Sequence, residues 1–169
     1  FVDPRIDGGK ANSRTKEDIV EVIDILGEEN LIYKCPDINI AFIRGTYADE
    51  KGNISMEHEA TYSEATCIAQ AVKNCGGTVI VQVEKVVKEG TIDPKIVKIP
   101  SIYVDYIVEA EKEDQAQVLG QDYDPSLTGE ANMVVDALQP LNLNERKIIG
   151  RRAAMELSER QVVNIGIGM

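Results

Sequence analysis

The pattern of apolar positions predicts alternating strands and helices through the middle of the chain. Apolar runs at 38–45, 78–83 and 103–108 are short and bounded by turn residues, which is typical of buried strands. A helix is expected between the first two runs. Strand, helix and strand in this order favour a βαβ unit, so we expect an α/β fold with an open, mostly parallel sheet and helices on both faces.

The helix of this unit has its own start and stop signals. Four apolar residues recur at helical spacing, so that one face of the helix is apolar: Ala65, Ile68, Ala69 and Val72. Before them, Thr61 and Glu64 have the spacing of a capping box. After them, Gly76 and Gly77 predict the end of the helix.

The first third of the chain is less regular. Residues 1–18 are rich in Gly, Asp, Lys and Asn and predict a loop. The apolar runs 19–25 and 31–33, separated by 27–30, favour a β-hairpin, although a short helix here is the alternative. Residues 49–53 predict a tight turn, in which Gly52 adopts a positive φ.

The last third changes character. Segment 111–142 holds seven acidic residues and one basic residue, and it predicts a linker; a long surface loop within one domain is the alternative. Beyond it, Asn142 or Asn144 predicts the cap of a helix that runs to about Ser158. A strand at 161–165 is expected to follow and to enter Gly166-Ile167-Gly168.

Composition and charge exclude several classes of function. The chain has 169 residues and a net charge of −11, which makes nucleic acid and anionic membranes poor partners. The single histidine, His58, excludes a metal site or triad that needs two, and its polar surroundings predict an exposed side chain. The cysteines Cys35, Cys67 and Cys75 are odd in number and lack metal-ligand spacing. We interpret them as reduced packing residues of a cytoplasmic protein.

The glycines after residue 165 are the sharpest clue to chemistry. At the carboxyl end of a parallel strand, glycine lets backbone amides approach an anion or a developing oxyanion. The first half of a dinucleotide-binding motif and an ordinary tight turn are the alternatives. Three arginines could meet phosphates or pair with carboxylates: Arg146, Arg151 and Arg152.

Five separated blocks carry a resemblance that spans the whole chain. They resemble, in the same order, the family I coenzyme A transferases, and most closely the single-chain acetate or propionate type. The blocks are Phe1–Arg5 with Gly8–Lys10, Ile40–Ser55, Ala69–Gly77, Val97–Pro100 with Val104-Asp105, and Arg151–Leu157 with Val163–Gly168.

The resemblance implies an internal piece of a longer polypeptide. Residues 1–110 would be the later part of an α-like domain, 111–142 an acidic linker, and 143–169 the start of a β-like domain. Both domains would be incomplete here. An apolar run that stops at Met169 agrees with this expectation.

The resemblance also implies a mechanism and a set of site residues. A glutamate would carry coenzyme A in a ping-pong transfer between a short-chain acyl-CoA and a carboxylate. Its motif has no match in this chain, so we assign no catalytic residue, and Glu156 is expected only at a mid-helix interface position. Asn164, Gly166 and Gly168 are expected to line the acyl-CoA pocket. A turn that the family shares comprises Asp49, Gly52 and Asn53.

Cofactors and partners follow from the same resemblance. We expect no permanently bound cofactor and no metal, with a coenzyme A thioester as substrate. The partners are an acyl-CoA and a short-chain carboxylate, and the full-length chain is expected to form a homo-oligomer without nucleic acid or membrane. An acyl-CoA hydrolase on the same fold and a non-catalytic ligand-binding fragment are the rival functions, and the fragment alone is expected to be inactive.

Overall fold

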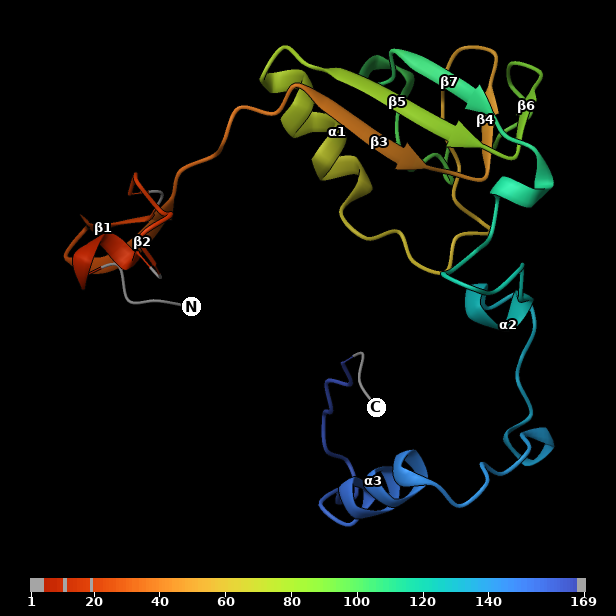
Figure 1. Ribbon diagram of the computed structural model, residues 1–169. Helices are drawn as coiled ribbons and strands as arrows, with labels where there is room; N and C mark the ends of the chain where they lie inside the picture. The colour runs from red at the N-terminus through yellow and green to blue at the C-terminus, as the bar shows by residue number, and fades with distance from the viewer. Residues whose placement is uncertain (1–4, 11, 19, 167–169) are drawn as a thin grey trace. The chain divides into compact units, whose positions relative to one another are not determined.

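The computed structural model describes residues 5–10, 12–18 and 20–166 (Figure 1). The chain divides into two compact units, Phe1–Thr128 and Gly129–Met169, and each is described by itself. The boundary between the units therefore falls inside the predicted linker 111–142, and the part of it from Glu111 to Thr128 belongs to the first unit.

A three-stranded parallel sheet forms the centre of the first unit (Figure 1). Its strands are β3 (Ile40–Arg44), β5 (Thr78–Val83) and β7 (Tyr106–Glu109), in the order β3-β5-β7. Helix α1 (Ala65–Asn74) connects β3 to β5, which confirms the predicted βαβ unit and the α/β fold. The third strand begins later than predicted, because residues 101–103 form a 3₁₀ turn.

The core lies between α1 and one face of this sheet. Alternate residues of the strands are buried, as a period of two requires, and they meet the apolar stripe of the helix. The buried residues of these elements are Ala41, Ile43, Ala65, Ala69, Val72, Val79, Val81 and Val83. Ile68, which was predicted to share the buried stripe, is exposed instead.

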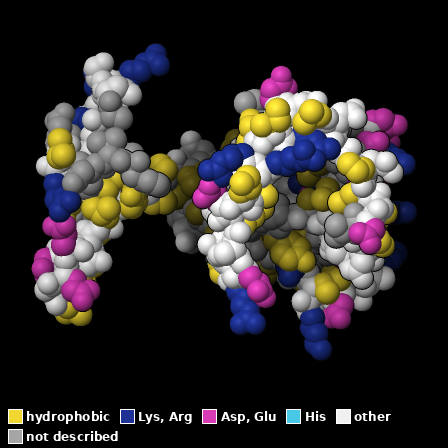
Figure 2. Space-filling model, turned by 90° about the horizontal axis from the view of Figure 1, so that it is seen from below, with side chains coloured by type: hydrophobic (Ala, Val, Ile, Leu, Met, Phe, Trp, Pro, Cys, Tyr) yellow, Lys and Arg dark blue, Asp and Glu magenta, His cyan; other side chains and the backbone are white. Residues whose placement is uncertain are grey.

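The opposite face of the sheet is open. Phe42 on β3 is 81% exposed, and Ile40 is 52% exposed. The prediction that 38–45 is a buried strand is therefore wrong for one face, because within the described ranges α1 is the one helix that packs on this sheet. Apolar side chains remain at the molecular surface in many places (Figure 2).

The two ends of α1 differ in how well the sequence predicted them. Thr61 does not cap the helix: its Oγ1 accepts a hydrogen bond from the Ser63 N–H at 3.2 Å, while Glu64 occupies the N-cap position without a side-chain bond. At the other end, Gly76 has φ 74°, and the Gly77 N–H donates to the Val72 carbonyl at 2.8 Å. This is a Schellman motif, so the predicted stop is confirmed.

A second parallel pair extends the core beyond β3 and β5. It comprises β4 (Tyr47–Asp49) and β6 (Lys85–Val87). Ile54 forms bridges to Ala48 and Ile99, and all three side chains are fully buried. Gly45 makes this packing possible, since a Cβ there would lie 2.3 Å from Cγ2 of Ile54.

The hairpin predicted near the N-terminus is confirmed, with a shorter turn. Strands β1 (Val20–Ile25) and β2 (Glu28–Tyr33) pair in antiparallel register. The turn consists of Leu26 and Gly27, with φ 55° and 87°, which are values of a type I′ turn. Glu28–Asn30 therefore belong to the second strand rather than to the turn. Ile19 lies outside the described residues.

A short helix lies at the end of the first unit. Helix α2 (Pro125–Thr128) is a single turn near the end of the unit.

The three cysteines, predicted as packing residues, are free and exposed. Cys67 lies on α1 away from its buried stripe, which explains why it packs against neither the sheet nor the core.

The second unit holds helix α3 (Glu145–Ala154). Asn144 caps it as predicted, because its Oδ1 accepts a hydrogen bond from the Lys147 N–H at 3.0 Å. The helix ends before Ser158, and the predicted strand at 161–165 is wrong: no described strand pairs with these residues, and a strand requires a hydrogen-bonded neighbour. No described residue of 129–166 is buried.

Candidate functional site

The carboxyl edge of the parallel sheet is the first place to look for a site. Open α/β sheets bind their ligands outside the carboxyl ends of their strands. Here β3, β5 and β7 end at Arg44, Val83 and Glu109. Each of these strands is followed by a loop, and side chains from these loops lie close together around His58.

His58 lies among these loops with its ring held on several sides. Its Nδ1 lies 3.0 and 3.1 Å from the two carboxylate oxygens of Glu84, the residue directly after β5. Its backbone N–H donates to Oγ1 of Thr46 at 2.8 Å. The ring also packs against Tyr47 and Tyr123. The His58 side chain is 23% exposed, so the prediction of a solvent-exposed histidine is wrong.

The segment after β7 folds back over this edge. Arg44, at the end of β3, donates from its guanidinium to the carbonyls of Ala116 and Gln117, the latter at 2.9 Å. The same guanidinium pairs with Glu59 at 2.7 Å. Gln117 is buried, and its Nε2 donates to the His58 carbonyl at 2.8 Å. Part of the acidic stretch is thus a packed loop of this unit.

Together these elements enclose a cavity of about 360 Å³, which we call the edge cavity. That volume lies in the range of small-molecule sites. The carboxylates of Glu84 and Asp122 and the ammonium group of Lys112 contribute to its wall. It is lined by His58, Glu84, Ala110, Lys112, Gln115, Asp122 and Tyr123.

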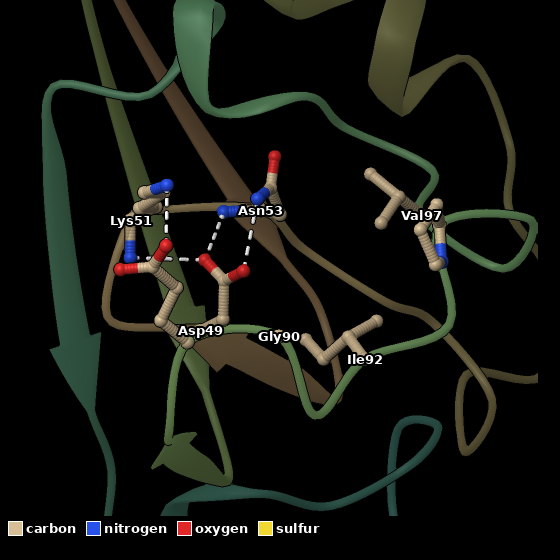
Figure 3. A pocket seen from close by; sticks show the side chains of 8 residues that line it. Asp49, Lys51, Asn53, Gly90, Ile92 and Val97 are labelled. Atoms are coloured by element: carbon tan, nitrogen blue, oxygen red, sulfur yellow. Dashed lines mark hydrogen bonds and ion pairs between the residues drawn. The ribbon is translucent and has the colours of Figure 1, made fainter.

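The turn at 49–53 borders a second cavity, of about 320 Å³ (Figure 3). The Asp49 carboxylate accepts hydrogen bonds from the Lys51 N–H at 3.0 Å and from the Asn53 N–H and Nδ2, both at 2.9 Å. Burial acts to raise the pKa of the Asp49 carboxyl, but the hydrogen bonds from Asn53, Lys51 and Gly52 outweigh it and lower the pKa.

These contacts point to a structural role for the turn. Asn53 Oδ1 accepts a hydrogen bond from the Ser101 N–H at 3.1 Å, which ties the turn to the following loop. Gly52 has φ 96°, as predicted for this position. In Figure 3 the side chains of Asp49 and Asn53 point toward each other, whereas Ile92 and Val97 form the apolar side of the cavity. The polar groups of the turn are engaged with one another.

The three predicted pocket residues belong to the end of the second unit, and two of them are described. Asn164 and Gly166 are exposed and lie in irregular structure after α3. A Cβ at Gly166 would meet no atom within 4 Å among the residues that the structure describes. Gly168 lies outside the described residues. The role of these three residues in an acyl-CoA pocket stays a prediction.

The structure also gives the position of Glu156 and bears on metal sites and membrane helices. Glu156 lies beyond the last residue of α3 rather than in the middle of the helix, and it pairs with Arg152. Among residues 5–10, 12–18 and 20–166, no three metal-ligating side chains come together. In the same part of the chain, no helix has both the length and the apolar composition needed to cross a bilayer.

Sequence reasoning missed the residues that line the edge cavity. The signal that was available is positional: Glu84 and Ala110 each follow the last residue of a strand. The contributions of Gln115 and Tyr123 had no such signal, because their segment was predicted to be a linker. Arg44 was visible at the end of its strand, but the two carbonyls that its guanidinium binds lie more than seventy residues later.

A comparison with protein families gives a match to one of them. The model described as "Coenzyme A transferase" matches residues 2–110. A caffeate CoA-transferase of Acetobacterium woodii is 48% identical over 170 residues, covering 100% of this chain and 32% of that protein. The acetate CoA-transferase YdiF of Escherichia coli O157:H7 is 41% identical, with the same coverage. The chain therefore spans about a third of the length of these relatives.

Solved structures agree with the sequence comparisons. The crystal structure of the YdiF apoenzyme, described as an acyl-CoA transferase, superposes with a TM-score of 0.80 at 41% identity. It covers 99% of this chain and 31% of that chain. The same enzyme has been solved as a thioester complex with CoA, which superposes with a TM-score of 0.74 at 43% identity over 92% of this chain and 30% of that one.

Proposed function

The chain belongs to the coenzyme A transferase family, and we propose that the polypeptide of which it forms part transfers coenzyme A between a short-chain acyl-CoA and a carboxylic acid. The observation that carries this proposal is the 48% identity to one CoA-transferase across the whole chain. Acetate or propionate is the proposed small acid, and the name of the relative that is 41% identical supports acetate.

The proposed chemistry is a ping-pong transfer through a glutamate. Its carboxylate attacks the thioester carbonyl, the C–S bond breaks, and an acyl-glutamyl anhydride and CoA thiolate form. The thiolate then attacks the glutamyl carbonyl, which releases the first carboxylate and leaves a glutamyl-CoA thioester. An incoming carboxylate reverses these steps and leaves as the new acyl-CoA. Covalent catalysis of this kind divides one difficult exchange into easier steps.

We propose that the nucleophilic glutamate belongs to the longer polypeptide rather than to these 169 residues. Two glutamates near the carboxyl edge are already engaged. The Glu59 side chain is 9% exposed and pairs with Arg44, and Glu84 pairs with His58. A hydrogen-bonded partner that stabilises the charge of a carboxylate makes that carboxylate a weaker nucleophile.

Asn164, Gly166 and Gly168 are proposed to line the acyl-CoA pocket of the complete site. The resemblance of this segment to a loop near the family's active site supports this role, and a glycine lets a substrate approach the backbone without meeting a side chain. Backbone N–H groups in such a segment can stabilise the oxyanion that forms when a carboxylate attacks a carbonyl.

The setting of the enzyme is also proposed. Free, exposed cysteines suit a reducing compartment such as the cytoplasm. We further propose that the full-length chain forms a homo-oligomer, and that it uses no permanently bound cofactor, since the glutamate itself carries coenzyme A.

An aromatic acid is a second candidate for one of the two exchanging acids. It is favoured by a specific observation: the caffeate CoA-transferase is more similar to this chain than the acetate CoA-transferase is, at 48% against 41% identity. Transfer between a short-chain acyl-CoA and an aromatic acid would agree with the names of both relatives.

The first test is the intact mass of the full-length polypeptide with and without acetyl-CoA. A covalent adduct of the mass of coenzyme A, removed by added acetate or propionate, is the expected result. In the variant Gly166→Val the adduct should not form, although its circular dichroism should match that of the wild type. An adduct of normal yield in this variant would remove Gly166 from the pocket.

The rival functions give different results. A hydrolase would lower the total concentration of thioester when propionyl-CoA is mixed with acetate, whereas a transferase conserves it. A non-catalytic binding protein would form no covalent adduct under any condition. Either outcome would contradict the proposed function.

A further inference from the structure

The charge of the edge cavity limits what can occupy it. Glu84 and Asp122 place two carboxylates in its wall, against the single ammonium group of Lys112. A ligand that presents a carboxylate or phosphate to this wall would meet repulsion from both acids. A neutral group that donates hydrogen bonds would instead find acceptors, because each carboxylate oxygen offers more than one lone pair.

The aromatic side chains limit the occupant further. The rings of His58 and Tyr123 lie with centroids 4.8 Å apart and planes tilted by 48°. Tyr47 lies behind His58, edge-on, at 5.5 Å. Both His58 and Tyr123 line the cavity, so its wall contains aromatic groups with which another ring can interact favourably.

Hydrogen bonds hold one part of the wall, around His58, in place. Glu84 holds the His58 ring, and Thr46 and Gln117 hold its backbone. Gln117 also accepts a hydrogen bond from the Asp124 N–H at 2.9 Å, which fixes the residue after Tyr123. A side chain that is already held by hydrogen bonds loses less conformational entropy on binding. The cavity volume, about 360 Å³, also leaves room for a substituted six-membered ring.

We propose that the edge cavity binds a hydroxylated aromatic ring carried by one of the two acids that exchange coenzyme A. The ring packs against Tyr123, and its hydroxyl groups donate hydrogen bonds to Asp122 and Glu84. The carboxyl end of the same acid lies outside the cavity, away from these two carboxylates. The inference rests on the proposed function, because it names the substrate class that the transferase selects.

The test uses the full-length polypeptide with propionyl-CoA as donor and three acceptors: caffeate, cinnamate and acetate. Caffeate and cinnamate differ only in two ring hydroxyls, so their ratio of kcat/KM isolates the hydroxyl contacts. We expect kcat/KM for caffeate to exceed that for cinnamate by about tenfold or more. In Asp122→Ala this ratio should fall about tenfold.

Asp122 suits the test because it is exposed, so its removal leaves the fold intact. The matched control is Asp114→Ala, which removes the same charge from the same segment but does not line the cavity. It should leave the caffeate to cinnamate ratio at its wild-type value. Titration of the polypeptide with catechol alone, followed by calorimetry, should show binding that Tyr123→Ala weakens.

Three results would overturn the inference. One is an Asp122→Ala variant with an unaltered ratio. Another is an Asp122→Ala variant that raises the KM for propionyl-CoA equally with every acceptor, which would assign the cavity to coenzyme A. Transfer to acetate without catechol binding would leave the proposed function standing and remove only the ring site. Absence of transfer to every acid would contradict the proposed function, while the catechol titration would still decide what the cavity binds.

Discussion

Helices α1 and α3 have the same length, ten residues, but different surroundings. In α1 three residues are buried against the parallel sheet, whereas no residue of α3 is buried. Both carry apolar side chains at helical spacing. The difference lies in the partner, because α1 packs on strands from the same unit and α3 has none among the described residues.

The comparison shows where helix stability comes from in this chain. A ten-residue helix is too short to be stable in water by its own hydrogen bonds. Helix α1 is stabilised by its packing, even though its N-cap makes no side-chain bond. Within these 169 residues, local terms act on helix α3, such as the cap at Asn144 and the arginines in its last turn. Four pairs of changes test this contrast.

The largest effect is expected from one substitution placed in both helices. Ala69→Glu puts a charge without a partner into a position that is fully buried, and it should lower the free energy of unfolding by about 4 kcal/mol or more. Ala153→Glu, on the exposed surface of α3, should change it by less than about 0.5 kcal/mol. Urea unfolding followed by circular dichroism measures both. Equal effects would refute the contrast.

Two glycines provide the next test. In Gly77→Ala the new Cβ would lie 2.5 Å from the Asn39 carbonyl oxygen, so the variant should lose about 2 kcal/mol of stability. In Gly150→Ala the Cβ meets nothing within 4 Å, and the helicity of α3 should rise by the equivalent of about 0.5 to 1 kcal/mol. A stabilised Gly77→Ala variant, measured by thermal melting, would show that the sheet shifts to accept the methyl group.

Asp105 links α1 to the sheet, and its effect depends on pH. The Lys73 ammonium, which hydrogen-bonds the Asp105 carboxylate at 2.7 Å, lowers the pKa of that carboxyl, and the Val79 N–H at 2.8 Å adds to the shift. A lowered pKa means that the stabilisation is complete above the ordinary value of 3.8 and is lost as the pH falls below it.

Asp105→Asn should therefore be less stable than the wild type by about 1 kcal/mol at pH 7, and this gap should close as the pH is lowered toward 2. Unfolding curves at several pH values measure it. The control Asp114→Asn, in an exposed segment, should show no such trend. A gap that stays constant with pH would mean that the carboxylate charge does not matter.

The smallest effects concern the helix caps. Asn144→Ala removes the acceptor for the Lys147 N–H and should lower the stability of α3 by about 0.5 to 1 kcal/mol. Glu64→Asn should give α1 the side-chain cap it lacks, with a gain of similar size. The helical signal of each variant at 222 nm, together with hydrogen exchange of the first helical turn, distinguishes the two changes. No gain in Glu64→Asn would mean that packing alone sets the start of α1.

The sequence predicted elements whose cause is local. The stop of α1 at Gly76, the positive φ of Gly52 and the cap at Asn144 each depend on a few neighbouring residues, and all three are confirmed. Thr61 shows the limit of such reasoning, because its hydroxyl bonds the backbone two residues later and so does not reach the helix.

The features that escaped prediction depend on contacts between distant residues. His58 is shielded by Glu84 and by the segment around Gln117, which single-sequence patterns do not bring together. The strand expected at 161–165 had the right composition but has no neighbour to pair with among the described residues. Family resemblance supplied the expectation for Asn164 and Gly166, which stays a prediction.

The parallel pairing of β3 with β5 has a consequence for the newly made chain. Ile40 pairs with Thr78, so β3 leaves the ribosome and waits for about 40 more residues before its neighbour exists. At roughly 5–20 residues per second this interval is about 2 to 8 seconds. Throughout that time, unpaired backbone groups and the apolar side chain of Phe42 are available to other chains. We therefore expect slower translation across this segment to increase the fraction of chains that aggregate before they fold.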